Sequence, residues 1–242
     1  MGPSSMKKPF LISNIKLDRA EKLITELSDS FKIYLNNNPL TLLLNKTSTP
    51  ILLDFSCEDP DAIVGTIVGD VLNNIRASLD VMAATMACLN GDASEAVQFP
   101  FDMAATDFSA ESASHNFDKA GRHALHILRS VAKLNSKIMY LMAIPALQSH
   151  AYAGLIRLAP SVSNIKIKGS YVLDNPNTDD ISIVSYDIKF LFSNIYNLPE
   201  QNIIDYLIIV AGLARAIIEA FESHLGTDMI EIEKRLTLNG EK

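Results

Sequence analysis

The chain lacks the cysteine patterns and long apolar runs that mark metal sites, disulfide frameworks and membrane spans. Its 242 residues include two cysteines, Cys57 and Cys88, whose spacing fits neither a metal centre nor a disulfide framework. No uninterrupted apolar run reaches the roughly 18 residues of a membrane span, although hydrophobic residues make up 48% of the chain. The N-terminus carries no apolar segment typical of a signal peptide. We therefore expect a cytoplasmic protein with no membrane role and no metal site.

Signatures of several common enzyme classes are also missing. The sequence contains no Walker loop, no Gly-x-Gly-x-x-Gly string and no pattern typical of a Ser-His-Asp triad, so we expect no cofactor. The formal net charge of −7 argues against nonspecific binding to duplex nucleic acid, because that affinity comes mainly from Lys and Arg neutralising phosphates. A local basic cleft remains compatible with this charge.

The sequence indicates a single domain behind a short tag. Residues 1–5 (Met-Gly-Pro-Ser-Ser) precede a second methionine and look like a cloning remnant, and residues 6–242 are long enough for one sizeable core. Helical periodicity and cap signals predict helices over about 17–35, 61–89, 116–142, 145–157 and 200–224. Gly226 is a plausible C-cap for the last of these, and a charged helix over 228–235 is expected to follow it.

The remaining segments predict strands and one ordered loop. Residues 50–57 look extended, and residues 164–193 alternate in the manner of a β-hairpin, on which Lys166, Lys168 and Lys189 are interpreted as protecting an exposed strand edge. Residues 91–115 are predicted to form a surface loop anchored by Phe99 and Phe101. The fold class is therefore mainly α, with four long helices in a bundle and a small antiparallel β-hairpin insertion near 164–193.

The last long helix is apolar on most of its circumference, which requires burial on nearly every side. Either it is the central helix of the bundle or it forms an interface with a second copy. We expect a homodimer.

Residues 69–80 place a polar row along an otherwise apolar helix. Asp70, Asn73 and Asn74 belong to this row, and Arg76 and Asp80 lie four residues apart, where they are able to pair. Burying such groups costs several kcal/mol unless they satisfy one another or a ligand. The row is therefore read either as a structural network that fixes the helix or as a ligand or RNA pocket.

The string Gly-Asp-x-Leu-x-Asn-Ile-Arg-x-Ser-Leu-Asp at 69–80, with Phe99-Pro100 after it, resembles a widespread set of uncharacterised bacterial proteins. Their motif has the form Gly-Asp-x-x-His-Asn-Leu-Arg-Ser-Ala-Leu-Asp-His. The resemblance covers roughly residues 17–220 and is strongest over 65–101. Its helical core is similar to HEPN domains, which include many RNases and also non-catalytic members that bind nucleotides or dimerise. The resemblance thus implies a HEPN-like bundle.

The resemblance also implies where catalytic groups would stand. HEPN RNases use an Arg, which corresponds to Arg76, and a His about one and a half turns later, which corresponds to Val81 here. The other motif histidine corresponds to Asn73, and of a further Asp-Lys-His-Arg segment only Lys137 remains. Because valine cannot transfer a proton, the departure predicts a non-catalytic binding or regulatory module. By analogy with the family, such modules often belong to bacterial or phage conflict systems.

A second cluster of cationic and titratable residues lies on the expected third helix. Arg122, His123, His126 and Arg129 fall within two turns and could bind phosphate, although a solvated helix face with one core-lining histidine is the simpler explanation. Two alternatives therefore stay open. One is an RNA- or nucleotide-processing enzyme whose site is rebuilt from Arg76, Asp80, His123 and His126. The other is a small nucleotide binder with the polar row and Lys137 lining a pocket between the second and third helices.

Overall fold

The computed structural model describes residues 9–45, 52–92, 96–101, 115–134, 137, 139–152, 158–168, 182–192 and 202–239. It confirms a mainly helical protein with small antiparallel hairpins. The long helices are α1 (Leu11–Asn36), α2 (Ala62–Leu89) and α7 (Ile203–Asn239). The shorter ones are η1 (Phe117–Ala120), α4 (Arg122–Leu134), α5 (Met139–Met142) and α6 (Ile144–Tyr152). The tag expected at residues 1–5 lies outside the described residues.

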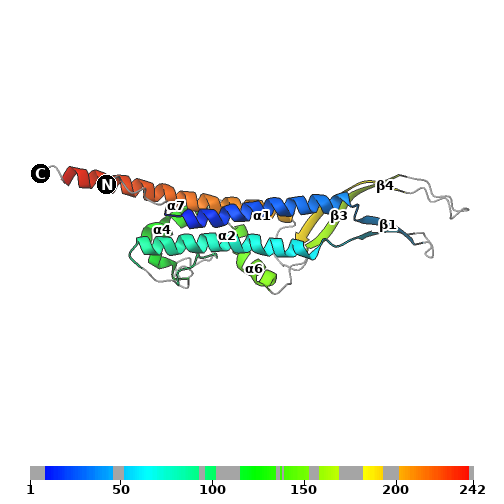
Figure 1. The fold of residues 1–242 in the computed structure, drawn as a ribbon, viewed down its shortest axis with the longest axis horizontal. Coiled ribbons are helices and arrows are strands. Elements are labelled where there is room, and N and C mark those ends of the chain that lie inside the picture. Colours follow the sequence, from blue (N-terminus) through cyan, green and yellow to red (C-terminus); the bar gives the residue numbers. More distant parts are fainter. Residues whose placement is uncertain are drawn as a thin grey trace, which may run out of the picture.

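The three long helices run along the long axis of the molecule, and both hairpins project from the same end of it (Figure 1). The start of α1 lies beside the later part of α7, since Asn14 contacts Glu222 while Glu21 contacts Arg215. These two helices are therefore antiparallel. Within the described residues, no helix is both long and apolar enough to cross a membrane.

Helix α2 begins and ends where the sequence predicts. The Asp61 side chain accepts a hydrogen bond from the backbone N–H of Ile63 at 3.0 Å, which caps the first turn. The predicted apolar stripe is buried throughout, comprising Val64, Val68, Val71, Ile75, Leu79, Met82 and Met86. Helix α1 starts at Leu11 rather than near 17, because its buried stripe continues toward the N-terminus through Ser13 and reaches Phe10 just before the helix.

The predicted third helix over 116–142 is wrong as a continuous element. Asn116 and Gly121 both adopt positive φ, at 55° and 92°, and they divide the segment into η1 and α4. A Cβ on Gly121 would lie 2.9 Å from the Asn90 side-chain oxygen, so the chain approaches the end of α2 closely here. The bundle therefore has three long helices and shorter ones instead of four long helices. Helix α6 covers the start of the helix predicted over 145–157.

Helix α7 buries one side in the bundle and exposes the other. Its buried positions recur from Ile203 to Phe221, and it packs against α1, α2, α4 and α5. Most apolar side chains of this segment are buried within the chain, whereas Ile208 is 53% exposed, so the interface with a second copy stays a prediction. The predicted end at Gly226 and the separate helix over 228–235 are wrong, since α7 continues to Asn239. A glycine inside a helix costs only about 1 kcal/mol relative to alanine, which does not suffice to end it.

The strands form two separate hairpins. β1 (Leu40–Asn45) pairs antiparallel with β2 (Leu52–Cys57), and β3 (Leu158–Lys168) pairs antiparallel with β4 (Ser182–Phe192). The second hairpin is the predicted insertion, although β3 begins at Leu158 rather than 164. Phe190 of β4 stacks on Phe31 of α1 with ring centroids 3.8 Å apart, and this contact attaches the hairpin to the bundle.

Phe99 and Phe101 are buried and pack on each other edge to face with ring centroids 5.1 Å apart. The described part of the 91–115 loop is therefore anchored as predicted. Residues 93–95 and 102–114 of that loop lie outside the described residues.

Candidate functional site

The predicted polar row on α2 meets a glutamine from α6. Arg76 donates from Nη1 to the Gln148 side-chain oxygen at 2.7 Å, and the Gln148 amide nitrogen donates to the Asn73 side-chain oxygen at 2.9 Å. Gln148 is only 6% exposed. Since both ends of a buried amide are satisfied by α2, this residue fixes the position of α6 on α2.

Arg76 and Asp80 form the predicted ion pair, with Nε and Oδ2 3.5 Å apart. The other carboxylate oxygen of Asp80 accepts a hydrogen bond from the backbone N–H of Phe99 at 2.9 Å. The guanidinium carbon of Arg76 lies 5.7 Å from the centre of the Phe101 ring. The pair therefore connects α2 to the 96–101 segment as well as to α6.

Burial is the largest influence on the Asp80 carboxyl and raises its pKa above the ordinary value. The Phe99 N–H, Arg76 and the positive charge of His115 act in the opposite direction without cancelling the effect. His115 accepts at its backbone oxygen from the Gln98 N–H at 3.0 Å, beside the Phe99 that binds Asp80, and the sequence analysis did not single out this residue. His115 ends the predicted loop over 91–115, where no helical or strand periodicity identifies a residue.

Asp70 and Asn74, the remaining predicted members of the row, bond to each other within α2. Asp70 is exposed, and its backbone oxygen accepts from the Asn74 side chain at 2.8 Å. This is a bond between successive turns of one helix, so it does not connect α2 to another element.

The second predicted cluster lies on another side of the bundle core. Arg122, His123, His126 and Arg129 are exposed on α4, which packs on α7 and η1. The His123 ring is 5.4 Å from the His224 ring of α7. The described contacts thus join His123 to α7 and Arg76 to α6, and they do not bring the two predicted groups into one cluster. Lys137 is exposed between α4 and α5.

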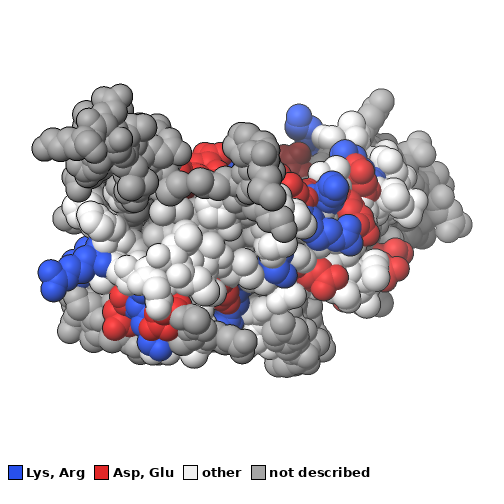
Figure 2. Space-filling model, turned by 60° about the vertical axis from the view of Figure 1, so that its left-hand side comes forward, with Lys and Arg blue, Asp and Glu red and all other residues white. Residues whose placement is uncertain are grey.

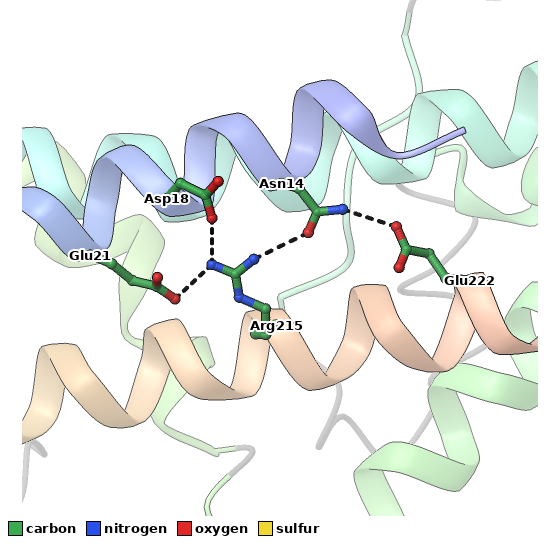
Figure 3. Close-up of polar contacts among 5 residues, drawn as sticks. All are labelled: Asn14, Asp18, Glu21, Arg215 and Glu222. Atoms are coloured by element: carbon green, nitrogen blue, oxygen red, sulfur yellow. Dashed lines mark hydrogen bonds and ion pairs between the residues drawn. The ribbon is translucent and has the colours of Figure 1, made fainter. Parts of the chain in front are cut away.

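A polar cluster that the sequence analysis did not predict joins α1 and α7. Arg215 donates from Nη2 to Asp18 at 2.8 Å and to Glu21 at 2.7 Å, and from Nη1 to Asn14 at 3.3 Å (Figure 3). Asn14 in turn donates to Glu222 at 2.9 Å. Burial lowers the pKa of Arg215, but the two carboxylates outweigh that effect and raise it. The available sequence signal was a lone arginine within the apolar run of α7.

No group of three or more His, Cys, Asp or Glu residues in the described part of the chain has a metal-binding arrangement. On the face that Figure 2 shows, lysine and arginine side chains intermingle with aspartate and glutamate around an uncharged central area. Comparisons with family models, curated proteins and solved structures found no match to this chain. The geometry of the site is therefore the basis on which its function is proposed.

Proposed function

We propose that this protein is a non-catalytic binding or regulatory module of the HEPN type. The observation that supports the proposal most strongly is the engagement of Arg76, which pairs with Asp80 and donates to Gln148. An arginine that stabilises a transition state must direct its charge at the substrate. Here the charge is met by a carboxylate of the same helix, and position 81 holds a half-buried valine that cannot transfer a proton.

The proposal includes a homodimer and a role in a bacterial or phage conflict system, by analogy with the resembling family. The interspersed charges on the face in Figure 2 favour a protein partner over duplex nucleic acid, since duplex binding needs a concentrated basic surface. Cytoplasmic location is part of the same proposal.

A second candidate, an RNA-processing enzyme, is favoured by one observation. The His115 backbone oxygen accepts from the Gln98 N–H at 3.0 Å, and the next residue, Phe99, donates to Asp80 at 2.9 Å, so an imidazole from this segment could supply the acid or base that Val81 cannot. This candidate requires Arg76 to release Gln148 or Asp80 when substrate binds.

The deciding experiment is incubation of the purified chain with labelled single-stranded RNA, alongside Arg76→Ala and His115→Ala variants. We expect no cleavage by any of the three. Cleavage by the wild type that both substitutions abolish, with unchanged circular dichroism, would overturn the proposal. Native mass spectrometry of the same sample reads any retained nucleotide-sized mass, which would instead support the nucleotide-binding alternative.

A further inference from the structure

The outer edge of β4 has the features of a pairing surface. β4 pairs with β3 and, among the described residues, with no other strand. Its residues Asp187 to Phe192 keep a regular register with β3, and Phe190 holds the strand on Phe31 and Tyr34 of α1. A strand edge that is held rigidly presents a fixed row of backbone donors and acceptors.

The edge of β3 is less suitable for this purpose. The irregular register between Ser163 and Ile167 is shared by β4 between Ile183 and Asp187, but Pro160 removes a backbone N–H from β3 alone. Lys166 and Lys168 would also place like charges near each other if two copies of β3 met.

The charges of β4 are complementary to themselves. Asp187 and Lys189 are exposed and stand on either side of Ile188. In an antiparallel pair of two β4 strands centred on Ile188, Asp187 of each copy lies opposite Lys189 of the other. The same register places Tyr186 opposite Phe190.

Asp187 and Lys189 can each form an ion pair with a second copy of the strand. Asp187 accepts from the Asn164 side chain through Oδ2 at 2.6 Å, which leaves Oδ1 available. Lys189 forms no ion pair with another described residue. Strand edges are commonly protected by lysine alone, whereas an Asp and a Lys two residues apart attract a second copy of the same strand.

We infer that β4 is a homodimer interface, in which two copies pair antiparallel about Ile188 and join their hairpins into one four-stranded sheet. This interface rests on the homodimer proposed above and is independent of whether the polar row on α2 binds a ligand. It also differs from the interface that the apolar sequence of α7 predicts, because β4 and α7 are separate elements.

Sedimentation equilibrium of the full chain over a range of concentrations tests the interface. Asp187→Lys and Lys189→Asp should each weaken dimerisation about tenfold or more, a loss of 1.4 kcal/mol for each factor of ten, because each variant creates two like-charge pairs. The double variant Asp187→Lys/Lys189→Asp should restore it, since the opposite charges face each other again.

Lys166→Asp is the matched control. It reverses an exposed charge on β3, the strand of the same hairpin that lies away from the proposed β4 interface. It should leave the dimer constant within about twofold of wild type, and circular dichroism checks that each variant folds. A wild-type chain that stays monomeric throughout, or a dimer equally strong in both single variants, would overturn the inference.

Discussion

The guanidinium of Arg76 donates a hydrogen bond of 2.7 Å to the side-chain oxygen of Gln148, 72 residues further along the chain. This contact joins α2, whose bounds the sequence predicts, to α6, for which the sequence signal is weak. Together with the Asp80–Phe99 bond it holds three separate segments at one point. The consequences for stability can be tested residue by residue.

Asp80 should give the protein a defined pH dependence. Its folded-state pKa is raised above the ordinary 3.8, so its contribution to stability is fully present below 3.8 and lost as pH rises through the raised pKa. Relative to Asp80→Asn, the wild type should gain free energy of unfolding as pH falls from neutral to 3.8. Urea denaturation measures the unfolding free energy of the wild type minus that of the variant, and a value that stays constant or falls as the pH is lowered would contradict the account.

Gly121 should tolerate alanine poorly. Its φ of 92° is unfavourable for any side chain, and the new Cβ would press on Asn90, so Gly121→Ala should cost about 1–3 kcal/mol. Gly212→Ala is the control, because no atom lies within 4 Å of a Cβ there. Within α7 that change should be neutral or should stabilise by up to about 1 kcal/mol. Thermal denaturation separates the two, and equal effects would argue against the close approach at Gly121.

Phe190 should secure the β3–β4 hairpin. Phe190→Ala removes the stacked contact with Phe31 and should cost about 3–5 kcal/mol, with faster hydrogen exchange in strands 158–168 and 182–192. Val184→Ala on the same strand, at a side chain 60% exposed, should change stability by no more than about 0.5 kcal/mol. If exchange in the hairpin is unchanged in Phe190→Ala, another contact attaches it.

Arg215 should contribute modestly and in a salt-dependent way. Its partners Asp18 and Glu21 are 56% and 48% exposed, so Arg215→Ala should cost about 1 kcal/mol at low salt and less at high salt. Lys32→Ala breaks a more exposed pair with Asp29 and should have a smaller effect. Urea denaturation at two salt concentrations provides the comparison. A cost that does not fall with salt would indicate that packing of the arginine stem matters more than its charge.

Local patterns in the sequence predict the fold well where one face is regular and capped. Asp61 and the apolar stripe of α2 have both signals, and that helix is confirmed from end to end. The break at Gly121 was missed because its positive φ and its close approach to Asn90, a residue distant in sequence, leave no local pattern. The helix end predicted at Gly226 is wrong for the opposite reason, because a helix can continue through a glycine. β1 was missed because its successive leucines do not alternate with polar residues.

The contacts of the candidate site also divide into those that local spacing predicts and those that depend on tertiary packing. Pairing of Arg76 with Asp80 depends on helical spacing alone and is confirmed. Gln148 and Phe99 reach the pair through tertiary packing, which no local pattern in the sequence records. The homodimer and the HEPN resemblance stay predictions.

The most direct test of the central claim is a double-mutant cycle on Arg76 and Gln148, measured by urea denaturation. Arg76→Ala should lose about 1–3 kcal/mol of unfolding free energy, and Gln148→Ala should share part of that loss, giving a coupling of about 1 kcal/mol or more. Asp70→Ala, an exposed change on the same helix, is the control. Additive losses, together with an unfolding free energy of Arg76→Ala within about 0.5 kcal/mol of wild type, would contradict a structural network. Arg76 would then be better explained as a ligand-binding residue.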